Sequence, residues 1–111
     1  MIEPSSGAGA GLTRVYLISF ASVWDAVLDH IASKRRWELV QADEEVGEIW
    51  ATRATGLRGK NKNDVRVRVS LDHNGLTQVT ATATATMKPR PEHSARLVKA
   101  FLANLDRRVS A

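Results

Sequence analysis

Histidines and carboxylates are the side chains of this sequence that could move protons or bind a metal. The three histidines, His30, His73 and His93, lack the i, i+4 spacing that places two imidazoles on one face of a zinc-binding helix, and we expect them to face solvent. Asp29 and Asp72 each precede a histidine, but sequence neighbours form a catalytic relay only if the fold brings their functional atoms within hydrogen-bond reach. We therefore predict no catalytic residue and no metal site, and we expect that the chain is not an enzyme.

The sequence also lacks the residues for several cofactor chemistries. It contains no cysteine, which rules out disulfides, thiolate catalysis, Cys-based zinc sites and iron–sulfur clusters. Residues 56–64 (GLRGKNKND) hold two glycines and two lysines, but with neither the Walker spacing nor the dinucleotide-binding pattern. No cofactor is predicted.

Basic side chains give a clearer chemical signal. The 111 residues include 16 Lys and Arg against 12 Asp and Glu, with a formal net charge of +4 and a pI of about 10, which weakly favours an acidic partner. Many of these cations lie between the expected strands and helices and would meet at one end of an up-and-down sheet. Two interpretations stay open: solvated loops and helix ends, or a site for nucleic acid or another polyanion. The polyanion site would comprise Arg35, Arg36, Arg58, Lys60, Lys62, Lys88 and Arg90.

Hydrophobic periodicity defines the elements that must position these residues. Alternating or β-branched runs predict strands, and apolar residues at helical spacing predict two helices, the first capped by Ser22 and ending near Lys34. The Gly-rich residues 1–13 are interpreted as a flexible leader that precedes a single domain spanning 14–111. The expected strands are 14–20, 37–41, 48–55, 65–71 and 77–86, and the helices are 22–34 and 92–109.

The last two strands form the best-defined hairpin. Valines alternate with arginines in 65–71, and valine or alanine alternates with threonine in 77–86. A three-residue loop of His73, Asn74 and Gly75 keeps the apolar residues on one face, and Gly75 supplies the left-handed position. This register pairs Arg68 with Thr80 and Arg66 with Thr82.

The element order β-α-β-β-β-β-α predicts an α+β fold with an antiparallel sheet of about five strands and two helices on one face. The other face would be open. We predict a non-enzymatic binding or assembly module that uses this open face or a sheet edge to contact a protein or a small ligand. Its candidate binding residues are Arg66, Arg68, Thr80 and Thr82. The three tryptophans could line a ligand pocket, although Trp24 lies on an apolar helix stripe and is expected in the core.

Residues 23–52 (VWDAVLDHIASKRRWELVQADEEVGEIWAT), with the hairpin and last helix that follow, resemble small bacterial lipoprotein-associated domains of the BamC type over residues 14–109. This resemblance implies a helix-grip or TATA-binding-protein-like layout and no established catalytic residues. The sequence lacks the lipidated cysteine of such lipoproteins and starts without the pattern of a signal peptide, which favours a cytoplasmic location. No stretch approaches the roughly 20 apolar residues of a membrane span.

Overall fold

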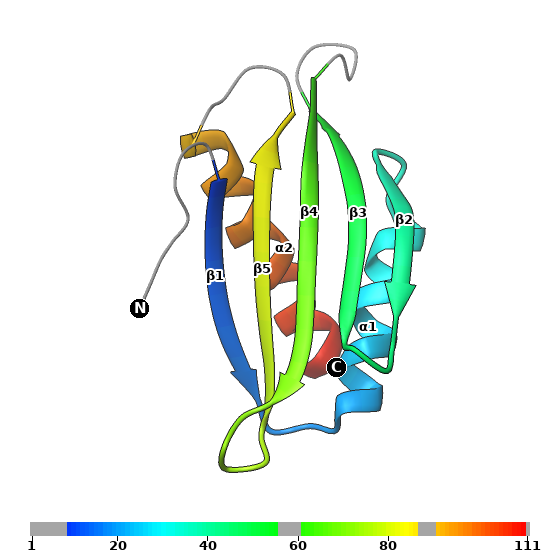
Figure 1. Ribbon diagram of the computed structural model, residues 1–111, viewed down its shortest axis with the longest axis vertical. Coiled ribbons are helices and arrows are strands. Elements are labelled where there is room, and N and C mark those ends of the chain that lie inside the picture. The colour runs from blue at the N-terminus through cyan, green and yellow to red at the C-terminus, as the bar shows by residue number, and fades with distance from the viewer. Residues whose placement is uncertain (1–8, 56–60, 87–90, 111) are drawn as a thin grey trace.

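The computed structural model describes residues 9–55, 61–86 and 91–110. One antiparallel sheet with the strand order β1-β5-β4-β3-β2 carries both helices on the same face, and Figure 1 views it from the opposite, open face. The predicted fold class is confirmed: the protein is an α+β helix-grip fold. Its elements are β1 (Gly9–Tyr16), α1 (Phe20–Ser33), β2 (Trp37–Asp43), β3 (Glu48–Thr55), β4 (Asn61–Leu71), β5 (Thr77–Ala85) and α2 (Pro91–Ser110).

Strand β1 begins and ends earlier than the sequence suggested. It pairs with β5 from Gly9 opposite Thr84 to Tyr16 opposite Thr77, so residues 9–13 belong to the sheet and not to a leader. The interpretation of residues 1–13 rested on composition, but backbone hydrogen bonding to β5 needs no large side chain. A side chain at Gly11 would collide with the methyl group of Thr82, which explains why a glycine lies opposite this threonine. Residues 1–8 lie outside the described part of the chain.

Helix α1 is capped by Ser19 and not, as predicted, by Ser22. The hydroxyl oxygen of Ser19 accepts a hydrogen bond from the Ser22 backbone N–H at 3.2 Å, which satisfies one of the free donors at the helix start. The helix ends at Ser33 with Lys34 as its C-cap, as the sequence indicated. Its buried stripe faces the sheet and comprises Val23, Trp24, Val27, His30 and Ile31.

The β4–β5 hairpin has the predicted register. Val69 lies opposite Val79, Val67 opposite Ala81 and Val65 opposite Ala83, and all six side chains are buried against the helices. Gly75 has a φ of 81°, and Asp72 and Leu76 close the three-residue loop through a 2.8 Å backbone hydrogen bond. The small Ala81 and Ala83 leave room for the buried side chains of α2, which are Val98, Phe101, Leu102 and Leu105.

Polar contacts fix α2 against the sheet at two points. Near its start, the buried Ser94 hydroxyl donates to Asn63 Oδ1 on β4 at 2.9 Å. Near its end, Asp106 accepts from Tyr16 and Arg14 on β1 at 2.6 and 2.8 Å. Within the described ranges, no helix is long and apolar enough to cross a membrane.

Candidate functional site

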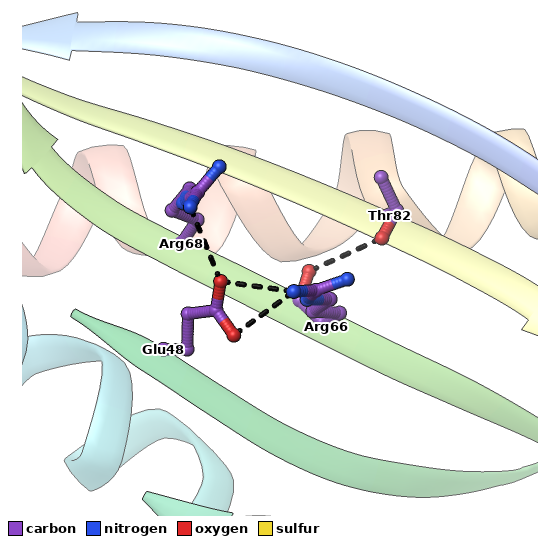
Figure 2. Close-up of polar contacts among 4 residues, drawn as sticks. All are labelled: Glu48, Arg66, Arg68 and Thr82. Carbon is purple, nitrogen blue, oxygen red and sulfur yellow. Dashed lines mark hydrogen bonds and ion pairs between the residues drawn. The ribbon is translucent and has the colours of Figure 1, made fainter. Parts of the chain in front are cut away.

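The open face of the sheet holds the binding residues predicted from the sequence. The structure brings Arg66, Arg68, Thr80 and Thr82 together there, on the neighbouring strands β4 and β5. Figure 2 shows that Glu48 of β3 lies between the two arginines, with Arg66 Nη2 at 2.9 Å from both carboxylate oxygens and Arg68 Nη2 at 3.4 Å from one of them. The charges of this surface are therefore paired within the sheet.

A further contact holds Arg66 in place. The Arg66 guanidinium lies 5.5 Å from the ring centre of Trp50, in cation–π geometry. Only 6% of the Glu48 side chain is exposed. A buried carboxylate with two partners gives Arg66 and Arg68 a structural role in the sheet. Whether they also bind a partner stays a prediction.

The basic end predicted from the connectivity is described in part. Arg35, Arg36 and Lys62 line one hollow of about 470 Å³, together with Trp37 and Glu38. The other four members of the predicted polyanion site, Arg58, Lys60, Lys88 and Arg90, lie outside the described residues. The structure thus brings three of the seven cations together beside the start of β2.

A larger pocket of about 750 Å³ opens at the same end, on the helix side of the sheet. It lies where the end of α1, the start of β2, the end of β3 and the part of α2 from His93 to Asn104 converge. Sequence reasoning did not find this pocket, because its lining comes from three stretches that are far apart in the chain. The lining residues are His30, Ser33, Lys34, Arg35, Arg36, Trp37, Arg53, Thr55, His93, Arg96, Leu97, Ala100, Phe101 and Asn104.

Three rings form an aromatic wall of this pocket. His30 meets the edge of Trp37 with ring centres 5.4 Å apart, and it meets Phe101 in the same way at 5.1 Å. Trp37 and Phe101 are themselves 5.7 Å apart and tilted by 39°. Trp37 is half-buried and Phe101 is buried, so the wall joins the core of the protein to the pocket. An aromatic ligand surface can pack on such a wall.

Cations surround the aromatic wall. Lys34, Arg35, Arg36, Arg53 and Arg96 line the pocket, and no carboxylate does among the described residues. Burial, and then the positive charge of Arg36, lower the pKa of Arg53 from its usual value, although the guanidinium stays protonated. The pocket therefore has a positive electrostatic potential.

All three histidines were expected to face solvent, and His73 and His93 do, but His30 is buried. Its side chain is 3% exposed, and its Nδ1 has no hydrogen-bond partner among the described residues. Burial, followed by the positive charges of Arg108, Lys34 and Arg53, lowers the pKa of His30 to about 4. The imidazole is therefore neutral at pH 7, and a neutral ring can donate one hydrogen bond and accept another. In the described ranges, no three His, Cys, Asp or Glu side chains gather to hold a metal.

Comparison with known proteins identifies the fold. No protein-family model and no curated protein matches the chain. The crystal structure of DynU16, a protein of the dynemicin biosynthetic locus, matches with a TM-score of 0.55 and 12% identity over 96% of this chain and 48% of that one. Protein CV1439 from Chromobacterium violaceum matches with a TM-score of 0.51 and 14% identity over 89% of this chain and 95% of that one. The chain spans about half the length of DynU16. At such identities the matches show the fold alone.

These neighbours correct the resemblance to BamC-type lipoprotein-associated domains, which is wrong. That resemblance rested on the order of elements and on a tryptophan-containing first helix, and both features occur in several folds. The sheet with both helices on one face was predicted from the sequence, and the structure adds the pocket on its helix side.

The expectation that the chain is not an enzyme is also corrected. DynU16, a protein of a biosynthetic locus, has the same fold, and the fold alone assigns no activity to this chain. The expectation relied on the absence of a local catalytic motif. A pocket assembled from distant segments needs no such motif, so the absence of a motif does not exclude catalysis.

Proposed function

We propose that this protein binds a small organic ligand in the pocket between the end of α1, the first half of α2 and the β2–β3 side of the sheet. One observation carries the proposal: a pocket of about 750 Å³ whose wall is built from the rings of His30, Trp37 and Phe101. Ligand pockets typically enclose about 300 to 1,000 Å³ and combine apolar walls with a few polar groups.

The position of the pocket in the fold supports this function. The aromatic wall is held from three elements, because His30 comes from α1, Trp37 from β2 and Phe101 from α2. Side chains fixed by packing from several elements form a pre-organised site, which lowers the entropy lost on binding. The smaller hollow, which is lined by Thr52, Ala54 and Lys62 of the open face, has Trp37 as the one aromatic residue of its described lining.

The test uses N-phenyl-1-naphthylamine, a neutral aromatic probe that fluoresces in apolar surroundings. We expect saturable binding to the wild-type protein, and we expect Ala100→Trp to weaken it about tenfold or more, because Ala100 lines the pocket and a large ring there fills it. Ala103→Trp is the matched control, since Ala103 is also exposed on α2 but does not line the pocket. Unsaturable binding, or equal affinity in the two variants, would reject the pocket as the site.

A polyanion at the basic end is the second candidate. The hollow of about 470 Å³ that contains Arg35, Arg36 and Lys62 supports it. This function predicts binding of labelled single-stranded DNA or RNA that weakens steeply with salt, and that weakens further in Arg35→Gln and Lys62→Gln. Affinity that is independent of salt would count against it.

A further inference from the structure

The pocket gathers positive charge from three segments of the chain. Lys34, Arg35 and Arg36 form the connection from α1 to β2, Arg53 comes from β3 and Arg96 from α2. The fold therefore brings two arginines that are distant in sequence to a local basic run. Like charges brought into one partly enclosed site repel one another, and the repulsion strengthens as water is excluded.

Elsewhere in the molecule, arginines that lie on the sheet have acidic partners. Arg14 pairs with Asp106 at 2.8 Å, and Arg66 and Arg68 pair with Glu48. In contrast, Lys34, Arg35 and Arg96 take part in no ion pair within the described ranges. An anion bound in the pocket would supply the charge that the protein itself does not.

Arg53 is the cation best placed to meet a ligand at the aromatic wall. It stands opposite Trp37 in the β2–β3 ladder and shares the helix-covered face of β3 with Ile49 and Ala51. Its half-buried guanidinium donates one hydrogen bond to the carbonyl oxygen of Ala54. A guanidinium has five N–H donors in a planar fork that matches a carboxylate or a phosphate, so donors remain for a ligand.

We infer that the pocket recognises an organic anion, in which an aromatic body packs on His30, Trp37 and Phe101 while a carboxylate or phosphate group contacts Arg53 and Arg96. This inference rests on the proposed function, since it specifies the ligand of the same pocket. His30 fits the assignment: its neutral ring offers a hydrogen-bonding group beside the aromatic body without adding to the positive charge.

The first experiment compares two probes that share one ring system. 8-Anilinonaphthalene-1-sulfonate has the rings of N-phenyl-1-naphthylamine plus an anionic group. We expect the anionic probe to bind at least about tenfold more tightly than the neutral probe. Arg96→Gln and Arg53→Gln should each weaken binding of the anionic probe about tenfold. Each should change the affinity for the neutral probe by less than about twofold. Arg96 is exposed, so its variant keeps the test valid if Arg53→Gln does not fold.

Lys99→Gln is the matched control, because Lys99 is an exposed cation of α2 that does not line the pocket. If the neutral probe binds but the anionic probe is no tighter, the inference is overturned and the proposed function stands. If Lys99→Gln weakens the anionic probe as much as Arg96→Gln does, the anion is bound by the general charge of the surface, and the inference is again overturned. If neither probe binds, the proposed function itself fails.

Competition identifies the anionic group. We expect 2-naphthoate or 2-naphthyl phosphate to displace the anionic probe, and the tighter of the two indicates whether the natural group is a carboxylate or a phosphate. Naphthalene without an acidic group should displace it at least about tenfold less well. Equal displacement by all three compounds would overturn the inference.

The imidazole of His30 gives a readout that does not depend on fluorescence. In the free protein, the positive charges of Arg108 of α2, Lys34 after α1 and Arg53 of β3 lower its pKa. Arg36, Arg96 and His93 line the same pocket, and Asp29 is the neighbour of His30 in sequence. A bound anion reverses part of this field. We expect saturation with 2-naphthoate to raise the pKa of His30 by NMR titration, and an unchanged pKa would contradict an anion beside the ring.

Discussion

The open face and the pocket both contain arginines on neighbouring strands, yet they use them differently. On the open face, Arg66 and Arg68 of β4 contact Glu48, a carboxylate whose side chain is only 6% exposed (Figure 2). In the pocket, Arg53 of β3 lies with other cations, and no acidic side chain lines that pocket among the described residues. The two surfaces lie on opposite faces of the same sheet, with Glu48 at the start of β3 and Arg53 toward its end.

This difference separates charge that stabilises the protein from charge that is available to a ligand. A buried carboxylate between two cations is satisfied within the fold, and removing it leaves the cations without a partner. A group of cations without a carboxylate destabilises the folded state slightly, and a bound anion relieves that cost. The same residue type can therefore be structural on one face and functional on the other.

The largest expected effect concerns Gly47, which positions Glu48 at the start of β3. Gly47 has a φ of 78°, and a Cβ there would collide with the carbonyl oxygen of Val69. Gly47→Ala should lower the free energy of unfolding by about 3 kcal/mol or more, because backbone strain adds to the collision. Urea denaturation followed by tryptophan fluorescence measures this change.

Gly75→Ala is the control for that substitution. Gly75 has a similar φ of 81°, but a Cβ there meets nothing within 4 Å. Its replacement should cost only the conformational strain, about 1 kcal/mol. Equal losses in the two variants would show that the close approach to Val69 does not matter.

The second prediction concerns the pH dependence of the pocket side. The imidazole of His30 titrates near 6.5 in an unfolded chain, whereas burial and the neighbouring cations lower its pKa to about 4 in the folded protein. The unfolded state therefore binds a proton between these values that the folded state does not. His30 contributes its full stability above pH 6.5, and about 2 to 3 kcal/mol of it is lost as the pH falls to 4.

His30→Phe tests this contribution, since a ring of similar size keeps the contacts with Trp37 and Phe101. The difference in free energy of unfolding between wild type and His30→Phe should change by about 2 to 3 kcal/mol between pH 7 and pH 4. A pH-independent difference for His30→Phe would mean that the pKa of His30 is the same in the folded and the unfolded protein.

The third prediction tests the pairing on the open face. Glu48→Gln removes the negative charge that Arg66 and Arg68 share, and it should lower the free energy of unfolding by about 1 to 2 kcal/mol. The arginines are more than half exposed, so water replaces part of the lost interaction. Glu38→Gln, at an exposed position of β2, should change stability by less than about 0.5 kcal/mol. Similar small losses in both variants would show that the Glu48 pairs are not structural.

The sequence predicted the central strands β4 and β5 more accurately than the edge strand β1. Alternation in β4 and β5 fixed the register, because a shift by one residue would have moved valines such as Val67 to the open face. Strand β1 was placed too late because residues 9–13 have almost no side-chain pattern, and only pairing with β5 shows that they form a strand. Local patterns therefore sufficed where side chains alternate and failed where the backbone alone makes the contact.

The pocket could not be predicted as a whole, although Arg35, Arg36 and the tryptophans were named from the sequence, and two more of its residues carried a signal. His30 lies three residues after Val27, on the apolar stripe of α1, and Arg53 shares its strand face with Ile49 and Ala51. A polar residue on a face that should be buried is informative. The remaining information, that the ends of four elements enclose a space between helices and sheet, exists only in the tertiary structure.

The smallest expected effect compares two threonines of β5 that point to opposite faces. On the open face, the Thr80 hydroxyl lies 3.0 Å from that of Thr13, and the pair is exposed, so Thr80→Val should change the free energy of unfolding by less than about 0.5 kcal/mol. On the helix side, the buried Thr77 hydroxyl donates to the carbonyl oxygen of Ile18 at 2.6 Å, and Thr77→Val should cost about 1 to 3 kcal/mol because that acceptor loses its partner. A large loss for Thr80→Val would show that the open face depends on its threonines as well as on the Glu48 pairs. A small loss of stability in Thr80→Val would mean that the threonine hydroxyls of the open face are available to contact a partner.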